Sequence, residues 1–418
     1  MTLPSEIRRM VVEAIRDPDE SLASLDPNRL RREKWLEENR TLLALSLTSK
    51  IWTIDATSEL WSDIHIEDGL SDEEWATQIQ MLVQCTKMGH TNRLRRFTIF
   101  SHALVSLPDN IVPLVRDILS RSSALRCLQI VLRHQWQALV PFLPTLSFLN
   151  LRSFGVILFT YGEELREDQK SLEQFLVKQR TLENVESHSG WSTMLCNPTH
   201  LPELREACPL PKLKFFRGYL SDLRMLASSQ YLRSLSLVER GEESDFLQGL
   251  SLLANPFSNV IHITLLPPRQ IYFGRLSLRA LSTSFPALKT IEGLLLFPAS
   301  LEFIESQIEI PEPSTHLVRL EEVTLYEICK SGNYSAQQLI PALEDASVER
   351  AFKSLRSLFP SIGLAKHVRY ELSRKEGFRG TRRQISIMKT HYLSSSAGNH
   401  FETTIERSNG RSMTLAVI

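Results

Sequence analysis

The chain has 418 residues, and its 48 Lys and Arg residues balance its 48 Asp and Glu residues, so the formal net charge is zero. This balance argues against a dedicated nucleic-acid coat or a polybasic membrane binder, because each needs an excess of one sign. Hydrophobic residues make up 42% of the chain and charged residues 23%, values that are typical of a folded globular protein and exclude global disorder.

The cysteines and the apolar stretches predict a protein of a reducing compartment. The five cysteines are scattered singly along the chain and form no disulfide framework. The first sixteen residues lack the apolar core of a signal peptide, and the most apolar stretch, 139–159, is interrupted by prolines and polar residues. We therefore expect a cytoplasmic and/or nuclear protein with no nucleic-acid or membrane partner.

The N-terminal region predicts a small helical module. Residues 4–15 place apolar side chains on one helical stripe, and Asp17, which precedes Pro18, ends that helix. Residues 41–52 are apolar around most of their circumference, so this segment has to be covered both by its own module and by something else. Leu60 and Trp61 close the module, and Ile64 to Ile66 alternate like a strand.

These residues resemble an F-box. The family begins with Leu-Pro-x-Glu-Ile and continues with Leu-x-Leu-Ser-x-x-(Ser/Cys)-Lys-x-Trp, and the closing Leu-Trp is common in fungal members. The resemblance implies a three-helix module that docks on a Skp-family adaptor and, through it, on a cullin. The implied adaptor-binding residues are Leu3, Pro4, Ile7, Leu43, Leu45, Ser46, Lys50 and Trp52. Core positions of a helical hairpin are the alternative reading for Ile7, Leu43 and Leu47.

One departure from the F-box pattern is an insert at 17–40, where the family normally has a short loop. Residues 29–40 of this insert read as a charged helix. We interpret the insert as a solvated excursion. If it covers the partner face, adaptor binding is in doubt.

A second pattern recurs nine times after the N-terminal module. An apolar residue is followed three residues later by another, and usually by a third two residues after that. The first positions are Leu94, Leu125, Leu151, Leu182, Leu213, Leu232, Val260, Leu288 and Leu320. The second and third apolar residues share one face of a short strand, which needs neighbouring strands and a helix to cover it.

Helical stretches lie between these predicted strands. A Ser71…Glu74 capping box begins the first of them, at 71–85, and 168–178 has helical spacing. Further helices are predicted at 246–254, 276–283, 298–306 and 335–358. The array resembles a degenerate leucine-rich-repeat solenoid, in which Ser187, Gly218 and Gly293 interrupt the third apolar position. An ordinary α/β domain whose strands begin with leucine is the alternative.

The sequence contains no recognisable catalytic constellation. P-loop, dinucleotide-binding, zinc-protease, nucleophile-elbow and Cys-x-x-Cys motifs are all missing. The residue types of His188, Cys196, His200 and Cys208 suit zinc, but their spacing matches no compact finger. We therefore predict no enzyme, no metal and no cofactor, and hold a cryptic hydrolase only as a remote third possibility.

Basic residues occur around the first apolar position of the early repeats. We expect them on the concave sheet surface, where they would bind an acidic or phosphorylated substrate segment. The candidate residues are Arg95, Arg96, Arg126, Arg152 and Arg217. Solvated charge at the strand ends is the alternative. From 373 to 418 we see no periodic apolar face and predict a basic, disordered tail.

The sequence thus predicts a mixed α/β fold: a three-helix F-box at 1–65, a leucine-rich-repeat-like α/β solenoid at 66–372 and a tail at 373–418. The function that the resemblance implies is a substrate-recognition subunit of a cullin–RING (SCF-type) ubiquitin ligase that binds an unidentified protein substrate. A leucine-rich-repeat interaction scaffold unrelated to ubiquitin ligases is the alternative.

Overall fold

The structure is a computed structural model that describes residues 4–15, 29–67, 71–100, 110–132, 134–158, 164–187, 210–220, 223, 226, 229–238, 243–251, 253, 255–265, 271–309, 319–332, 340–377, 380–394 and 401–410. It has a mixed α/β fold that divides into two compact units, Met1–Tyr231 and Leu232–Ile418. We call them unit 1 and unit 2 and describe each separately.

Unit 1 contains strands that pair in parallel and in chain order. Their bounds are β1 Asp63–Glu67, β2 Arg96–Phe100, β3 Cys127–Leu132, β4 Ser153–Leu158, β5 Asn184–Ser187 and β6 Phe215–Gly218. Each strand from β2 to β6 begins two residues after the first apolar residue of the recurring pattern, so the predicted strand positions are confirmed here.

The second apolar residue of the pattern builds the core of unit 1. Strand register aligns these residues in one row across the sheet, and each is at most 1% exposed. The row runs Ile64, Phe97, Leu128, Phe154, Val185 and Phe216. Burying six large side chains in one row contributes on the order of 10 kcal/mol of favourable transfer free energy.

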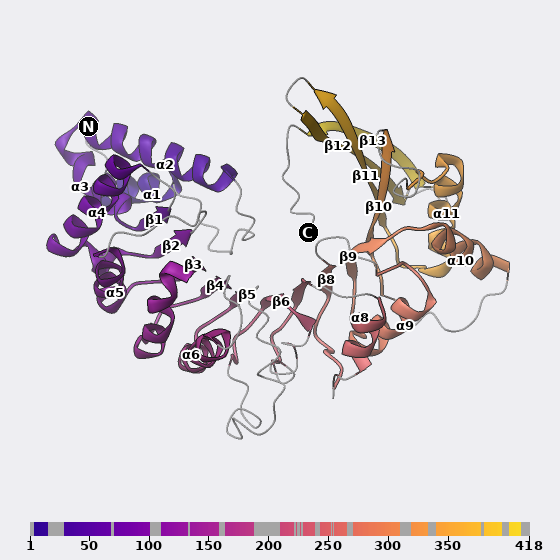
Figure 1. Cartoon of the computed structure of the whole chain (residues 1–418), viewed down its shortest axis with the longest axis horizontal. Helices are drawn as coiled ribbons and strands as arrows, with labels where there is room; N and C mark the ends of the chain where they lie inside the picture. Colours follow the sequence, from indigo (N-terminus) through magenta and orange to yellow (C-terminus); the bar gives the residue numbers. More distant parts are fainter. Residues whose placement is uncertain are drawn as a thin grey trace. The chain divides into compact units, whose positions relative to one another are not determined.

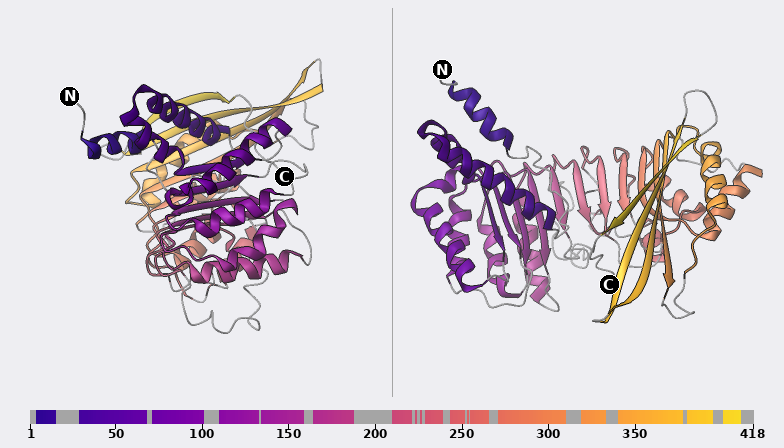
Figure 2. Two further views of the ribbon diagram at one scale, coloured as in Figure 1. Left: turned by 90° about the vertical axis from the view of Figure 1, so that its left-hand side faces the viewer. Right: turned by 90° about the horizontal axis from the view of Figure 1, so that it is seen from above.

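Helices cover this face of the sheet (Figure 2). They are α4 Asp72–Lys87, α5 Ile111–Arg121 and α6 Glu164–Lys178, with 3₁₀ segments η1 His90–Arg93 and η2 His134–Thr145. The predicted capping box is present, since Ser71 Oγ accepts from the Glu74 N–H while the Glu74 carboxylate accepts from the Ser71 N–H. The predicted helix at 168–178 corresponds to the later part of α6.

The N-terminal helices of unit 1 are α1 Ser5–Ile15, α2 Arg29–Thr48 and α3 Lys50–Leu60 (Figure 1). The prediction separated a helix at 29–40 from an apolar segment at 41–52, but α2 continues from 29–40 into the apolar segment and ends at Thr48, before Ser49. Ser49 has extended backbone and starts α3. Thr53 Oγ1 donates to the Ser46 carbonyl at 2.6 Å, which fixes the angle between the two helices.

Residues 17–28 of the predicted insert lie outside the described residues. The remainder of the insert, in the first half of α2, packs on unit 1 and is not the solvated excursion that was predicted. Its Trp35 ring lies 5.6 Å from the His65 ring of β1. Glu38 is buried, and its carboxylate acts electrostatically on Arg96 of β2. His65 and Arg96 alternate with the core residues Ile64 and Phe97, so α2 lies over the sheet face opposite α4 and α5.

Unit 2 repeats the parallel arrangement with β7 Ser234–Leu237, β8 His262–Leu265, β9 Thr290–Leu295, β10 Glu322–Gly332 and β11 Leu364–Gly377. The four predicted strands of this region are confirmed as β7 to β10. The accompanying helices are α8 Glu243–Ser251, α9 Arg275–Ser284, α10 Pro298–Glu309 and α11 Asp345–Leu358. The helix predicted from Ser335 begins only at Asp345.

Gly293 produces a bulge in β9. The register of β9 against β10 shifts there, so that Leu294 pairs with Leu325 and takes over the third apolar position of the pattern. Gly293 has φ +104°, and a Cβ on it would lie 2.1 Å from the Leu265 carbonyl oxygen. The glycine that interrupts the sequence pattern is therefore required by the close approach of β8.

The predicted disordered tail contains two further strands. β12 Gly380–Ser394 pairs antiparallel with β11, and β13 Phe401–Gly410 pairs antiparallel with β12. The prediction rested on the lack of a periodic apolar face, but Ile385, Ile387 and Met388 belong to a strand whose partner, β11, is long enough to pair with it throughout.

Candidate functional site

Helix α1 turns its charged side towards the protein. Arg8 Nε lies 3.0 Å from Asp55 Oδ2 of α3, and both side chains are about one-fifth exposed. Glu13 Oε1 lies 2.9 Å from Arg9 Nε and 3.3 Å from a guanidinium nitrogen of Arg95. Val12 is the apolar residue of α1 that is buried. The pairs Arg8–Asp55 and Glu13–Arg95 join α1 to other elements and, with buried Val12, define the side of the helix that faces the protein.

The apolar stripe of α1 consequently faces outward. Ile7, Met10 and Val11 are 43%, 64% and 43% exposed. An amphipathic helix on an isolated globular protein has the opposite orientation, with its apolar side buried. The orientation of α1 leaves a hydrophobic surface exposed to solvent, and a binding partner would bury it.

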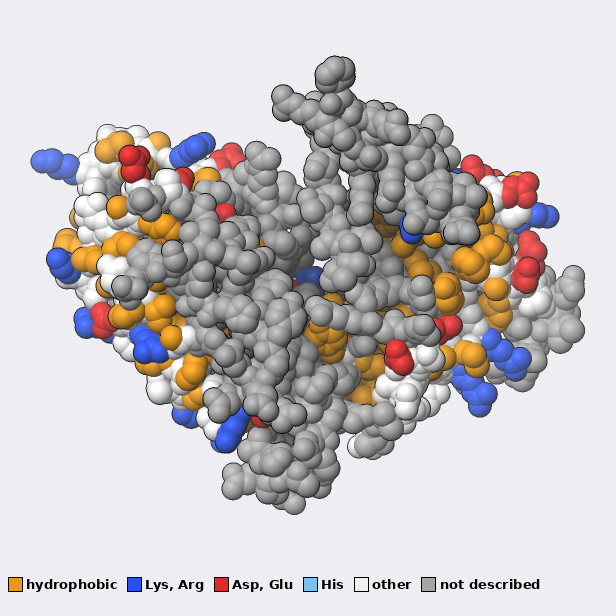
Figure 3. Space-filling model, viewed as in Figure 1, with side chains coloured by type: hydrophobic (Ala, Val, Ile, Leu, Met, Phe, Trp, Pro, Cys, Tyr) orange, Lys and Arg blue, Asp and Glu red, His pale blue; other side chains and the backbone are white. Residues whose placement is uncertain are grey.

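The end of α2 and the start of α3 continue this exposure. The exposed fractions are 52% for Leu43, 79% for Leu47, 41% for Ile51 and 72% for Ile54. Of the thirteen exposed large hydrophobic residues in the described part of the chain, seven lie on α1 to α3. We call these seven residues, which comprise Ile7, Met10, Val11, Leu43, Leu47, Ile51 and Ile54, the apolar docking face. Figure 3 shows hydrophobic side chains at the surface of this part of the chain.

The residues predicted to bind an adaptor fall in different environments. Leu3 lies outside the described residues. Pro4, Ile7, Leu43 and Lys50 are exposed, and Leu45 and Trp52 are half-buried. Ser46 is buried, and its hydroxyl donates to the Leu43 carbonyl at 2.6 Å. The exposed members can contact a partner directly, whereas Ser46 shapes the end of α2.

The sequence interpretation did not include five members of the docking face among the adaptor-binding residues: Met10, Val11, Leu47, Ile51 and Ile54. Met10 and Val11 were recognised as part of a helical stripe, but an apolar stripe is normally core. The signal for the reversed orientation is the matching charge on Arg8 and Glu13, whose partners Asp55 and Arg95 are distant in sequence.

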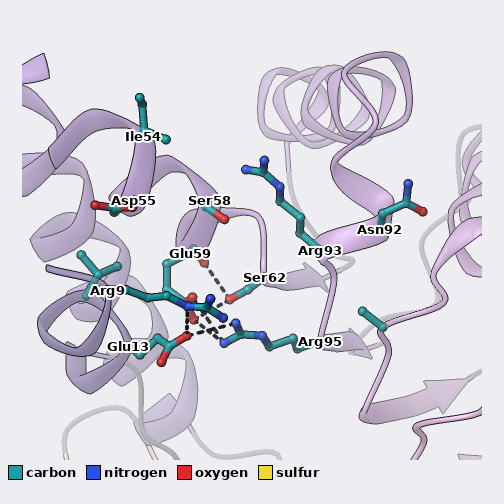
Figure 4. Close-up of a pocket in the computed structure, with 12 residues that line it drawn as sticks. Arg9, Glu13, Ile54, Asp55, Ser58, Glu59, Ser62, Asn92, Arg93 and Arg95 are labelled. Atoms are coloured by element: carbon teal, nitrogen blue, oxygen red, sulfur yellow. Dashed lines mark hydrogen bonds and ion pairs between the residues drawn. The ribbon is translucent and has the colours of Figure 1, made fainter. Parts of the chain in front are cut away.

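A polar pocket of about 420 Å³ lies behind the docking face, between α1, α3 and the segment before β2 (Figure 4). Arg95 Nη1 lies 3.4 Å from Oε2 of Glu59, whose Oε1 accepts from Ser62 Oγ at 2.8 Å. Arg95 thus connects α1, through Glu13, with α3, through Glu59. Ile54 belongs both to the lining of this pocket and to the docking face.

The five arginines predicted for substrate binding do not share one surface. Arg96 lies 3.4 Å from Asp63, and Arg217 lies 3.0 Å from the fully buried Glu186. Burial alone would lower the pKa of Arg96, but the carboxylates of Asp63 and Glu38 raise it above its ordinary value. These two side chains therefore each pair with a carboxylate of the neighbouring strand, Arg96 with β1 and Arg217 with β5.

The other three arginines lie at the edge where strands begin. Arg95 is engaged in the pocket, while Arg126 and Arg152 are exposed. Their backbone carbonyls extend the hydrogen bonding between neighbouring strands by one residue before each strand. For example, Arg126 O accepts from the N–H groups of Arg152 and Ser153 at 2.8 and 2.9 Å.

The described residues provide no cluster of three or more His, Cys, Asp or Glu side chains that could bind a metal ion. His188, Cys196, His200 and Cys208 lie outside them. Cys85, Cys127 and Cys329 are buried and not in a disulfide. Within the same described ranges, no helix combines the length and apolarity needed to cross a bilayer.

No protein family model matches the sequence, and no curated protein shows significant similarity to it. A function for the chain therefore has to come from its own residues and geometry.

Proposed function

We propose that this protein is a substrate-recognition subunit of a cullin–RING ubiquitin ligase, and that α1 to α3 dock on a Skp-family adaptor. The observation that carries the proposal is the orientation of α1, in which Arg8 and Glu13 pair with other elements while Ile7, Met10 and Val11 are exposed. The F-box resemblance of the same residues supports the choice of partner. In this proposal the strand-bearing remainder of the chain binds a protein substrate in the cytoplasm and/or nucleus.

The energetics of the docking face favour a protein partner. Burying each large apolar side chain contributes roughly 1.5–3 kcal/mol at full burial. Seven such residues on three helices that contact one another are sufficient for a stable apolar interface core. Scattered single hydrophobic residues need no explanation, but a concentration of this kind marks an interaction site.

The alternative is a scaffold in which α1 to α3 only cap the first strand. The contact of Trp35 with His65 favours this reading, because α2 does cover part of β1. A capping element, however, presents a polar outer face to solvent. The apolar outer face of α1 fits partner docking better than capping.

The test is co-expression of the full chain with an affinity-tagged Skp-family adaptor, followed by purification of the adaptor. Replacing Met10 and Leu47 together by Asp should abolish co-elution, because both side chains are strongly exposed and their loss leaves the core of unit 1 intact. Leu276→Asp on α9 is the matched control, since Leu276 is 66% exposed and lies in unit 2. It should bind like the wild type.

Two results would count against the proposal. Failure of the folded wild-type chain to bind the adaptor excludes the ligase function and leaves the scaffold. Binding that survives the Met10→Asp, Leu47→Asp double change removes the docking face as the site of attachment.

A further inference from the structure

The polar pocket behind the docking face has the size of a side-chain binding site. Its walls come from α1, from α3 and from the segment that leads into β2, and Ala124 completes the lining (Figure 4). Its volume of about 420 Å³ is at the small end of the range of about 300–1,000 Å³ that small-molecule sites occupy. The pocket therefore admits a side chain of a partner rather than a whole secondary-structure element.

Two carboxylates of the pocket are held by two of its arginines. Glu13 Oε1 lies 2.9 Å from Arg9 Nε and 3.3 Å from a nitrogen of Arg95. The same Arg95 guanidinium lies 3.4 Å from Glu59 Oε2. Glu59 is buried, and the Arg95 side chain is one-third exposed. At formal charges, these two arginines and two glutamates balance one another.

Arg93 is the remaining cation of the lining. The remaining carboxylate, Asp55, is already paired with Arg8 at 3.0 Å. Arg93 is exposed, and within the described part of the chain no carboxylate forms an ion pair with it. Its charge acts on the protein instead, since burial, and after it the charge of Arg93, lowers the pKa of His90 below its ordinary value. The lining together with Arg8 therefore has one positive charge in excess.

Two further hydrogen-bond donors line the pocket beside Arg93. Ser58 comes from α3 and Asn92 from the segment before β2. In the described ranges, neither side chain makes a hydrogen bond to another residue. Figure 4 shows Arg93 extending towards α3, on the side where Ser58 lies, while Arg95 extends towards Glu13. A guanidinium, a hydroxyl and an amide are donors that suit an anionic oxygen ligand.

The size of the charge excess favours a carboxylate over a phosphate. A phosphorylated side chain carries a charge of about −1.5 to −2 at pH 7, which is more than Arg93 can balance. Glu13 and Glu59, in the same lining, would repel the remainder. A carboxylate carries one negative charge and matches a guanidinium through two parallel hydrogen bonds.

Ile54 connects the pocket with the docking face. Its side chain is 72% exposed and belongs to both surfaces. Ser58 follows it by one helical turn on α3, so the two side chains lie on the same side of the helix. A partner that covers the docking face around Ile54 therefore also covers the mouth of the pocket.

We propose that the polar pocket binds an aspartate or glutamate side chain of the partner that covers the docking face, with Arg93 as its ion-pair partner. Ser58 and Asn92 donate further hydrogen bonds to the same carboxylate. The inference rests on the proposed function in taking this partner to be the Skp-family adaptor. The docking face supplies apolar contact area, and the pocket selects a partner that has an acidic side chain at the matching position.

The test measures the affinity of the full chain for the purified adaptor by biolayer interferometry. Arg93→Glu should weaken binding by at least about tenfold, because it places two carboxylates opposite each other, and Arg93→Lys should stay closer to the wild type. Wild-type binding should weaken more steeply with rising salt than binding by Arg93→Ala. The matched control is Arg180→Glu, which reverses an exposed arginine before β5 and outside the pocket lining and should bind like the wild type.

A charge exchange identifies the carboxylate on the adaptor. Replacing the Asp and Glu residues of the adaptor one at a time by Lys should restore binding to Arg93→Glu at one position. Three results would overturn the inference: wild-type affinity in Arg93→Glu, an equal loss in Arg180→Glu, and the lack of any single Lys replacement that restores binding.

The pocket and the proposed function fail in different ways. A folded wild-type chain that does not bind the adaptor contradicts both. Loss of binding in the Met10→Asp, Leu47→Asp variant, together with wild-type affinity in Arg93→Glu, contradicts the pocket alone and leaves the docking face as the site of attachment.

Discussion

Glu13 and Arg95 are 82 residues apart in sequence, and a nitrogen of the Arg95 guanidinium lies 3.3 Å from the Glu13 carboxylate. This ion pair holds α1 against the segment before β2, and Glu59 of α3 binds the same guanidinium. Within α1, the buried residue is the single apolar side chain of Val12. Charge pairing therefore decides which side of the helix faces the protein. The outward apolar stripe is a consequence of that pairing.

Replacing Arg95 by Ala should loosen α1 without unfolding unit 1. The Arg95 side chain is one-third exposed, so we expect a loss of only about 1 kcal/mol or less in the free energy of unfolding. Hydrogen–deuterium exchange should accelerate in α1. Arg93→Ala, which removes a nearby exposed arginine, is the control. Unchanged exchange in α1 would show that other contacts set its orientation.

The attachment of α1 should also weaken in acid. The hydrogen bond and the charge of Arg9, and after them the charge of Arg95, lower the pKa of Glu13 below its ordinary value of 4.5, against the opposing effect of burial. A carboxyl with a lowered folded-state pKa stabilises the fold above its unfolded pKa, and this contribution disappears as the pH falls through the folded value. Exchange in α1 should therefore rise below about pH 4.5, and Glu13→Gln should remove this dependence.

Gly293→Ala should destabilise unit 2 strongly. The residue combines a left-handed φ with a 2.1 Å approach of the added Cβ to the Leu265 carbonyl oxygen. We expect a loss of about 2–4 kcal/mol, because both the backbone of β9 and its pairing with β8 have to shift. Thermal unfolding measures it. Gly274→Ala is the control, since a Cβ there meets nothing within 4 Å, and an equal loss in both variants would contradict the bulge.

Glu327→Ala should cost about 3 kcal/mol of stability, because it leaves buried donors without their acceptor. Glu327 accepts from His367 Nε2 at 2.8 Å, from Arg369 Nε at 2.8 Å and from the Leu343 N–H at 2.7 Å. Burial by itself raises the pKa of Glu327, but these hydrogen bonds lower it overall. Chemical denaturation tests the expectation.

The matched control for Glu327 is Glu349→Ala. Glu349 pairs with Lys353 at 2.6 Å, but both side chains are nearly half exposed. We expect a change of about 0.5 kcal/mol or less. A similar loss of stability in Glu327→Ala and Glu349→Ala would contradict the expectation. It would show that the hydrogen bonds of Glu327 do not hold β10, β11 and the start of α11 together.

Glu173 on α6 should make the protein less stable as the pH rises. Burial raises its pKa to about 7, and its buried Oε1 has no hydrogen-bond partner. Between about pH 4.5 and 7 the unfolded chain releases this proton while the folded chain keeps it, so the free energy of unfolding falls by about 1–3 kcal/mol. Glu173→Gln should flatten the profile of melting temperature against pH. An unchanged profile would show that the carboxyl ionises freely in the folded state.

Much of the local structure follows from residue order. The nine occurrences of the recurring apolar pattern locate the strands from β2 to β10, because a residue pair two apart shares one strand face whatever the rest of the chain does. The Ser71 capping box locates the start of α4 for the same reason. Both signals are contained within a few neighbouring residues.

The tertiary structure decided the features that depend on distant partners. The β12 and β13 strands were missed because their alternation becomes meaningful only beside a long β11, and the bulge at Gly293 exists because β8 approaches it. The sequence determined that α1 is an amphipathic helix. Only the positions of Asp55 and Arg95 decided which side of it faces out, since a helix with one charged and one apolar side satisfies its local pattern equally well in either orientation.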